Sequence, residues 1–332
     1  MKKLLLPMTL VSASLLAACG SSSDDDPTTV VDVAQGDDRF ETLVTALTRA
    51  DLVTTLQGEG PFTVFAPTDD AFAAFLEENS LSAEGLLGSD TLADVLTYHV
   101  LPIEANSTTA ISAAESSIVN DTLLTTVQGD AVALSLSEGD LLVNEATVVQ
   151  ADVEADNGVI YAIDSVLTLP EKNALSDESK TITELVVALA DAETNAEFGI
   201  LKQAVVTAEL DTVLDGDGPF TVFAPTDAAF NAVLTALDIT ASELLAREDL
   251  ADILLKHVLT KRVNSSVAVL ADGANLVTAN ADGETVAIDA SNGVMVDSAM
   301  VTAADIYTSN GIVHQIDAVI LTDAIEAALQ PQ

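Results

Sequence analysis

The chain contains the same segment twice, and this internal repeat constrains its fold more than any other feature. Residues 60–72, GPFTVFAPTDDAF, return at 218–230 with a single difference. His99-Val-Leu returns as His257-Val-Leu at the same offset, and NGVIYAID at 157–164 returns as NGIVHQID at 310–317. Repeats of about 140 residues are too long for solenoid units. We therefore expect each copy to be a domain with its own core.

Each copy has a helical first half and a β-rich second half. Residues 62–65 alternate like a short strand that Pro67 ends, and Thr68 or Asp69 can then cap an amphipathic helix. The β-rich runs, separated by turn signals, are 122–127, 131–136 and 141–149. Asn-Gly pairs at 157–158 and 310–311 predict tight turns before the apolar strands 159–166 and 312–321. The pattern predicts an α+β domain, duplicated.

The repeated motifs resemble those of a known family. Thr-Val-Phe-Ala-Pro-Thr-Asp, followed by Asn-Gly-Val-Ile-x-x-Ile-Asp, is similar to the two signature segments of the fasciclin domain, and the Tyr98-His99 pair resembles that family's third motif. The match covers both repeats, residues 37–169 and 181–323. The resemblance implies two tandem domains, each a wedge of two β-sheets flanked by several helices. It also implies a secreted or surface-anchored protein that acts in adhesion or matrix binding and is not an enzyme.

Two positions depart from the family pattern. Tyr161 stands where the second motif commonly has histidine, as His314 does in the second repeat. Lys256 replaces the tyrosine of the Tyr-His pair, so only the first repeat keeps that pair.

The first residues read as a targeting signal. Lys2 and Lys3 precede an apolar stretch at 4–18, which is too short for a permanent membrane span and is typical of a signal peptide. It ends in Leu-Ala-Ala-Cys19, which resembles a bacterial lipoprotein box, and Cys19 is the only cysteine. We expect Cys19 to be lipidated; an ordinary secretory signal is the alternative. Because Gly20 follows the cysteine, the outer membrane is expected if the cell is Gram-negative.

The motifs and composition together divide the chain into six segments. These are a lipoprotein signal peptide (1–18), an acidic polar tether (19–36), the first fasciclin-like domain (37–169), a linker (170–180), the second fasciclin-like domain (181–323) and a C-terminal tail (324–332).

The composition is strongly acidic but apolar enough to fold. Asp and Glu number 53 against 11 Lys and Arg, giving a formal net charge of −42, while 49% of residues are hydrophobic. Disorder requires low hydrophobicity together with high charge, so a folded core of small aliphatic residues is expected. The missing basic stripe argues against nucleic acid as a partner. Repulsion from anionic surfaces favours neutral glycans, basic proteins or cation-bridged partners.

The histidines are the obvious candidates for chemistry. His99 and His257 lie on the apolar face of a predicted helix, so we expect buried, hydrogen-bonded structural roles. A metal site joining His257 and His314 is the alternative, and it is open only to the second domain. Asp164 and Asp317 follow apolar strands and are expected to accept backbone N–H bonds. No recognised catalytic motif occurs, so the sequence predicts neither catalytic residues nor a metal or cofactor.

Three further segments have structural interpretations. Residues 215–218 and 280–283 contain Asp and Gly as calcium loops do, but neither completes the pattern with a terminal Glu, and both are predicted to be turns. Residues 322–329 predict a helix packed on its own domain.

Three functional hypotheses follow. The first is a lipid-anchored, non-enzymatic adhesion or matrix-interaction protein of the cell envelope, whose partner is an extracellular or envelope protein or glycan. The second is a polysaccharide or small-ligand binding module, and the third an enzyme with an unrecognised site. For adhesion, Tyr98 and His99 are the candidate binding residues. His99 faces the core by its helical phase, whereas Tyr98 lies about 100° round the helix and is expected to point outward.

Overall fold

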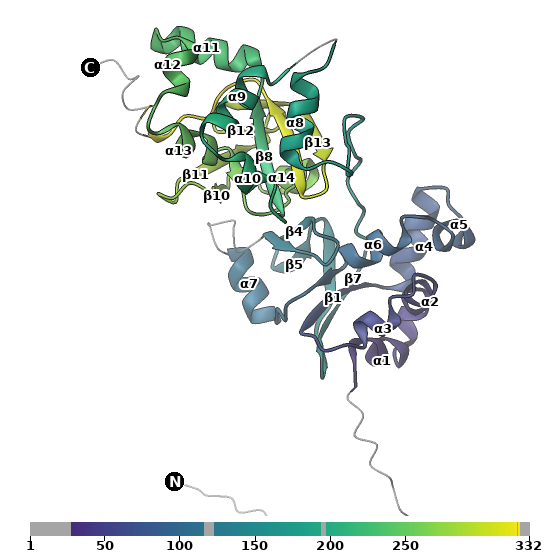
Figure 1. Cartoon of the computed structure of the whole chain (residues 1–332). Helices are drawn as coiled ribbons and strands as arrows, with labels where there is room; N and C mark the ends of the chain where they lie inside the picture. Colours follow the sequence, from purple (N-terminus) through teal and green to yellow (C-terminus); the bar gives the residue numbers. More distant parts are fainter. Residues whose placement is uncertain (1–27, 116–122, 194–196, 324, 326–332) are drawn as a thin grey trace, which may run out of the picture.

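The computed structural model describes residues 28–115, 123–193, 197–323 and 325. The described residues form two domains, one for each repeat, with the first in purple to teal and the second in teal to yellow (Figure 1). Each domain combines one seven-stranded sheet with several helices, so the predicted duplicated α+β fold is confirmed. The signal peptide, Cys19 and most of the segment 322–329 lie outside the described residues.

The helices of the first domain come mainly from the first half of its sequence. They are α1 (Val30–Gln35), the 3-10 turn η1 (Asp38–Phe40), α2 (Glu41–Arg49), α3 (Val53–Leu56), α4 (Asp69–Glu78), α5 (Ala83–Leu87), α6 (Leu92–Tyr98) and α7 (Ser107–Glu115). Its strands are β1 (Phe62–Pro67), β2 (Val100–Leu101), β3 (Leu123–Thr125), β4 (Ala131–Ser137), β5 (Asp140–Val143), β6 (Ala146–Ala155) and β7 (Gly158–Ile163).

The second domain repeats this order. Its helices are α8 (Ile182–Ala190), α9 (Gly199–Thr207), α10 (Asp211–Leu214), α11 (Asp227–Leu237), α12 (Ala241–Leu245), α13 (Leu250–Leu255) and α14 (Ser265–Leu270). Its strands are β8 (Phe220–Pro225), β9 (Val258–Leu259), β10 (Asn275–Val277), β11 (Thr285–Asp289), β12 (Met295–Val296), β13 (Ala299–Tyr307) and β14 (Gly311–Ile316).

The two repeated motifs pair with each other at the centre of each sheet. The strand order is β2-β1-β7-β6-β5-β4-β3 in the first domain and β9-β8-β14-β13-β12-β11-β10 in the second. The pairs β1–β7 and β8–β14 are parallel, and the other pairs are antiparallel. A Cβ atom on Gly158 would lie 2.1 Å from the Phe62 carbonyl oxygen, and one on Gly311 would lie 2.4 Å from that of Phe220. Only glycine fits there, because the parallel strands begin in close backbone contact.

In each domain, all seven strands are hydrogen-bonded to their neighbours in one continuous sheet. The family resemblance implies a wedge of two sheets in each domain. Register shifts interrupt β6 between Val148 and Val153, and β13 between Val301 and Ile306. Such bulges bend a strand and increase its twist, which lets a single sheet wrap around the core. Asp152 and Asp305 sit at these irregularities with left-handed φ angles of 54° and 60°.

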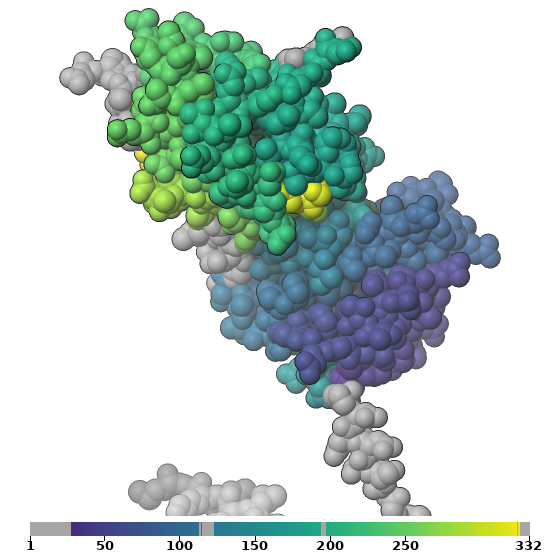
Figure 2. All heavy atoms as spheres, in the orientation of Figure 1, coloured from purple at the N-terminus to yellow at the C-terminus, as the bar shows by residue number. Residues whose placement is uncertain are grey.

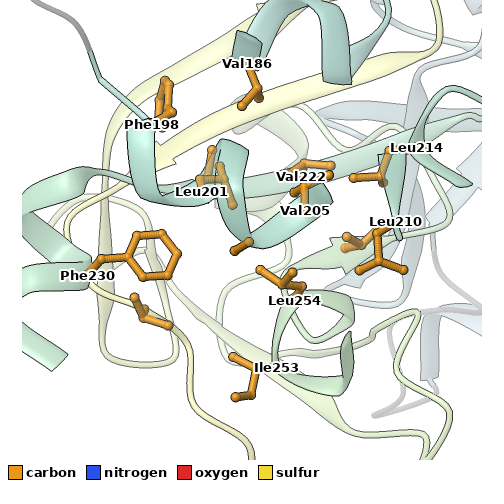
Figure 3. Close-up of a cluster of buried hydrophobic side chains, with 14 of the residues drawn as sticks. Val186, Phe198, Leu201, Val205, Leu210, Leu214, Val222, Phe230, Ile253 and Leu254 are labelled. Atoms are coloured by element: carbon orange, nitrogen blue, oxygen red, sulfur yellow. The ribbon is translucent and has the colours of Figure 1, made fainter. Parts of the chain in front are cut away.

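Each domain has its own apolar core. In the second domain, side chains from α8, α9, α11 and α13 converge on strand β8, as Val186, Leu201, Phe230 and Val222 show among others in Figure 3. In the first domain an equivalent cluster joins α1, α2, α4 and α6 to β1 and β7. A 9-residue helix is marginal in water on its own. Packing of these apolar faces therefore stabilises the helices.

The structure extends two of the expected segments. The tether was expected to reach residue 36, yet residues 30–35 form α1, and Val30, Val31 and Ala34 are buried in the first core. The expected linker is not a free spacer either. Asn173 donates its backbone N–H to Asp305 O and its side-chain amide to Ala304 O, and Asp177 N–H donates to Tyr307 O. Residues 173–177 thus pack along β13 of the second domain.

Candidate functional site

The histidines of the Tyr-His and Lys-His positions are structural. His99 is 2% exposed; its Nδ1 lies 2.7 Å from Val95 O, and its Nε2 accepts the Leu167 N–H at 2.9 Å. His257 repeats this with Ile253 O and the Ile320 N–H. Burial lowers the pKa of each imidazole to about 4, so each is neutral at pH 7. The predicted buried, hydrogen-bonded histidines are confirmed.

A serine, an aspartate and a histidine meet in the second domain, but not as a catalytic triad. Ser265 Oγ donates to the Asp305 carboxylate, which also accepts the Ser265 N–H at 2.8 Å. The two nitrogens of His314 bond instead to the Asp305 backbone N–H and to Val263 O. A triad requires the imidazole to reach the serine hydroxyl. Here the histidine joins backbone groups, and burial lowers its pKa.

The first domain shows the same arrangement with tyrosine in place of that histidine. Tyr161 OH donates to Ala105 O at 2.7 Å, the position equivalent to Val263 O. Asp152 accepts the N–H and the hydroxyl of Ser107, as Asp305 does for Ser265. The His-to-Tyr departure therefore preserves one structural hydrogen bond.

The asparagines of the Asn-Gly pairs have roles that the sequence did not reveal. Asn157 Oδ1 accepts the Val30 N–H of α1, while its Nδ2 donates to Leu56 O and Gly58 O. Asn310 does the same for Ile182, Leu214 and Gly216 in the second domain. These amides join the first helix of each domain to the loop before β1 or β8. The same partners in both copies make this a structural clamp.

The aspartates after the central strands cap neighbouring backbone. Asp164 accepts the Thr147 N–H at 2.8 Å and Asp317 the Met300 N–H at 2.7 Å, as the sequence predicted.

The expectation of an exposed Tyr98 is wrong. Its side chain is 1% exposed, its hydroxyl donates to Ala131 O at 3.1 Å, and it accepts from Asn144 Nδ2 at 3.1 Å. Burial raises its pKa to about 12. Helical phase alone predicts that the Tyr98 face of α6 is exposed to solvent. In the structure, strand β4 and the β5–β6 turn cover this face. Tyr98 and the buried His99 therefore lack the exposed surface expected of a binding pair.

A buried junction joins the two domains beside Tyr98. Ala131 N–H donates to Arg262 O at 2.9 Å, and Lys261 Nζ donates to Leu123 O at 2.7 Å. The Asp130 carboxylate accepts from Tyr307 OH at 3.0 Å and lies 3.6 Å from Arg262 Nε.

Apolar contacts seal this junction. Leu123, Ala131 and Ala133 of the first domain belong to one apolar cluster with residues of the second, among them Val263 and Val267. Figure 2 shows the two domains in direct contact. The domains thus share a small core.

The Asp130 carboxylate lies buried in this junction. Its residue is 1% exposed, and burial raises its pKa to about 6 against the opposing effects of Arg262, Tyr307 and Lys172. Burying a carboxylate costs free energy unless its partners compensate fully, and here they compensate in part.

Next to the junction lies a cleft of about 650 Å³, which we call the interdomain cleft. Its walls come from α4 and the 144–146 turn of the first domain, the 164–170 segment, and α14 of the second. Tyr98 lies at its base. The carboxylates that line it are Glu78, Glu145 and Asp164, and none of its described lining residues is Lys, Arg or His.

Asn264 lines the same cleft and is fully buried. Its Oδ1 caps α14 by accepting the Val267 N–H at 3.0 Å. Its Nδ2 lies near enough to the Tyr98 hydroxyl to lower the pKa of that group, yet it makes no hydrogen bond to any described residue.

Among the described residues, no group of three or more His, Cys, Asp or Glu side chains is arranged to hold a metal ion. No helix within the described ranges is both long and apolar enough to cross a bilayer.

Fold and site together define a tandem pair of α+β domains with structural histidines and a shared junction. Residues 38–170 and 196–322 match the family model of the fasciclin domain. The chain belongs to the fasciclin-domain family.

Relatives are found in bacteria and animals. Protein sll1483 of Synechocystis sp. is 43% identical over 157 residues, which are 46% of this chain and 81% of that protein. Transforming growth factor-beta-induced protein ig-h3 of Oryctolagus cuniculus is 41% identical over 143 residues, 43% of this chain and 19% of that protein. Stabilin-2 of Rattus norvegicus is 29% identical over 220 residues, 65% of this chain and 14% of that protein.

Among solved structures, the chain is similar to a FAS1 domain pair from the insect cell adhesion molecule Fasciclin I. The two are 18% identical, with a TM-score of 0.36, over 86% of this chain and 97% of that one.

Proposed function

We propose that the chain is a lipid-anchored protein of the cell envelope that mediates adhesion or matrix interaction without catalysis. Fasciclin domains occur in cell-adhesion and extracellular-matrix proteins. The observation that carries the proposal is the match of both repeats to this domain. The buried junction supports it, because two joined domains present one extended surface to a partner.

The proposal that the chain is not an enzyme rests on how its histidine side chains are bonded. His99, His257 and His314 each use both ring nitrogens on backbone atoms, and burial lowers the pKa of each. A general base needs a free nitrogen within reach of a substrate proton. These imidazoles offer none.

The anchor rests on the sequence around Cys19. The small residues before Cys19 and the short apolar run suit cleavage and acylation at the thiol. Two or three acyl chains anchor a protein stably, at about 0.8 kcal/mol for each buried CH₂ group. Labelling cells with radioactive palmitate should mark the wild-type chain and leave Cys19→Ala unlabelled and unprocessed. Normal cleavage of Cys19→Ala would contradict lipidation, and recovery in the inner membrane would contradict the outer-membrane assignment.

An attachment assay tests adhesion. Cells lacking the chain would be complemented with the full chain or with residues 1–36 alone, and their aggregation and attachment to immobilised matrix proteins compared. We expect attachment only with the full chain. Equal attachment by both strains would remove the adhesion proposal.

A binding module at the envelope is the second candidate. The interdomain cleft favours it, because ligand sites are commonly concave, partly apolar and placed between domains.

A further inference from the structure

We propose that the interdomain cleft binds a short basic and apolar peptide segment of a partner protein. The inference deepens the proposed function, because it names a site and a ligand class for an envelope protein that contacts other proteins. This proposal does not require Tyr98 or His99 to be exposed.

The size and walls of the cleft fit an extended peptide. Its volume of about 650 Å³ lies in the range of ligand-binding pockets. Val269 and Leu270 of α14 line one wall and are 49% and 36% exposed, while Phe75 of α4 lines the other. Two apolar walls on separate domains can hold the side chains of a segment between them.

The charge of the cleft selects for a basic ligand. Glu78 and Glu145 are exposed in its lining and make no ion pair with a described residue. Asp164 adds a third carboxylate. The first domain has Arg39 and Arg49 as its only Lys or Arg residues, and neither lines the cleft. Lysine or arginine side chains of a peptide would supply the missing opposite charge.

The buried side chains behind the lining fix the shape of the cleft. Asn264 is fully buried, caps α14 through Oδ1, and places Nδ2 beside the Tyr98 hydroxyl. These contacts hold α14 of the second domain against α6 of the first, so the two walls are in place before a peptide binds.

The cleft fits a saccharide less well. The aromatic residues in its lining are Phe75 and Tyr98, and Tyr98 is 1% exposed. The described lining therefore offers a sugar ring only one half-buried aromatic side chain, that of Phe75, on which to stack. Peptide is the class that the apolar walls and unpaired carboxylates favour.

The test measures binding of labelled peptides to the purified full chain in detergent. The probes are an alternating lysine–leucine octapeptide, a glutamate–leucine octapeptide of the same length, and a neutral hexasaccharide of glucose. We expect saturable binding of the lysine–leucine peptide alone, weakening as salt is raised. Equal binding of both peptides, binding of the hexasaccharide only, or no binding would overturn the proposal.

Two variants locate the binding. Glu78→Gln with Glu145→Gln removes two exposed carboxylates and should weaken binding about three- to tenfold. Leu270→Ala removes an exposed apolar side chain from the α14 wall and should weaken binding about three- to tenfold at all salt concentrations. The matched control, Glu77→Gln with Asp140→Asn, changes two exposed carboxylates outside the cleft lining. Circular dichroism confirms that each variant is folded.

The outcomes separate the cleft from the adhesion proposal. If the control weakens binding as much as the cleft variants do, net charge and not the cleft binds the peptide, and the inference fails. If the peptide does not bind but the attachment assay still requires both domains, adhesion stands and the cleft inference alone fails.

Discussion

A single buried imidazole joins two segments of the first domain. His99 links the end of α6 to the backbone at Leu167. Only the neutral imidazole can accept the Leu167 N–H at Nε2, and burial lowers its pKa so that this form is present at pH 7. His99→Ala leaves two buried polar groups unpaired and a cavity, so we expect a loss of about 2–4 kcal/mol in the free energy of unfolding at pH 7. Urea denaturation of the full chain measures it. His257→Ala should cause a similar loss in the second domain.

The lowered pKa of His99 also predicts how the stability of the chain depends on pH. The folded pKa of His99 is about 4, below its ordinary value of 6.5, so the unfolded chain binds more protons between these values. Its contribution is complete above pH 6.5 and decreases as pH falls toward 4. At about 1.4 kcal/mol per pKa unit, the penalty of His99→Ala should shrink by about 2 kcal/mol between pH 7 and pH 5. A penalty independent of pH would contradict the buried neutral imidazole.

For Asp130 at the junction, the expected change of stability with pH has the opposite sign. Its folded pKa is raised to about 6, so the folded chain keeps a proton that the unfolded chain releases between pH 4 and 6. Ionised Asp130 therefore destabilises the junction above pH 6, and stability recovers on acidification. The stability of wild type relative to Asp130→Asn should fall by up to about 3 kcal/mol from pH 4 to pH 7. Asp152→Asn, at an exposed aspartate of β6, is the comparison, and parallel curves for all three proteins would contradict the prediction.

At the scale of the element, α1 shows a start signal that the sequence analysis missed. Thr29 and Asp32 form a capping box, as Thr181 and Glu184 do for α8, and each precedes or spans an apolar run. The acidic residues before Thr29 mask this signal, because they continue the polar composition of the tether up to the first turn of the helix. Its equivalence to α8 makes α1 part of the first domain.

This position of α1 predicts a measurable cost. Val31 is 1% exposed in the first core, whereas Val33 on the same helix is half-buried. Val31→Ala removes two buried methyl groups, so we expect a loss of about 2 kcal/mol in the free energy of unfolding, with Val33→Ala losing less. Urea denaturation compares the two variants. Equal and negligible losses in both variants would show that α1 belongs to the tether and not to the first domain.

Local patterns predicted the elements well and the long-range contacts poorly. Turn signals and caps located the starts of β4, α4 and the central strands to within about one residue, because those signals act between neighbours, whereas both central strands end three to five residues earlier than expected. The phase of α6 correctly buried His99. It could not show that Ala131, 33 residues further on, would cover Tyr98. The interdomain cleft was invisible for the same reason, since α14 joins it from the second repeat.

At the scale of the whole molecule, the two domains are separate in their main cores and joined at one edge. The clusters around Val64 and Val222 each draw on one domain, while the cluster around Leu123 draws on both. We therefore expect each domain to fold alone, as the repeat predicts, with a lower stability than in the full chain. The distribution of charge supports this arrangement, because Lys261 and Arg262 both lie at the junction.

The position at which the chain is divided should decide the stability of the second fragment. Residues 173–177 bond to β13, so a fragment 171–332 keeps these bonds and a fragment 178–332 loses them. At about 0.5–1.5 kcal/mol for each hydrogen bond, offset by the entropy of ordering the segment, the longer fragment should be more stable by about 1–3 kcal/mol. Fragment 28–170 should unfold cooperatively but at a lower temperature than the first domain in the full chain, since Leu123 and Ala131 lose their cover. Differential scanning calorimetry of the three fragments and the full chain measures both effects. Identical melting of the two second-domain fragments would show that residues 173–177 are a free linker after all, and a first-domain fragment as stable as in the full chain would show that the junction contributes nothing to its fold.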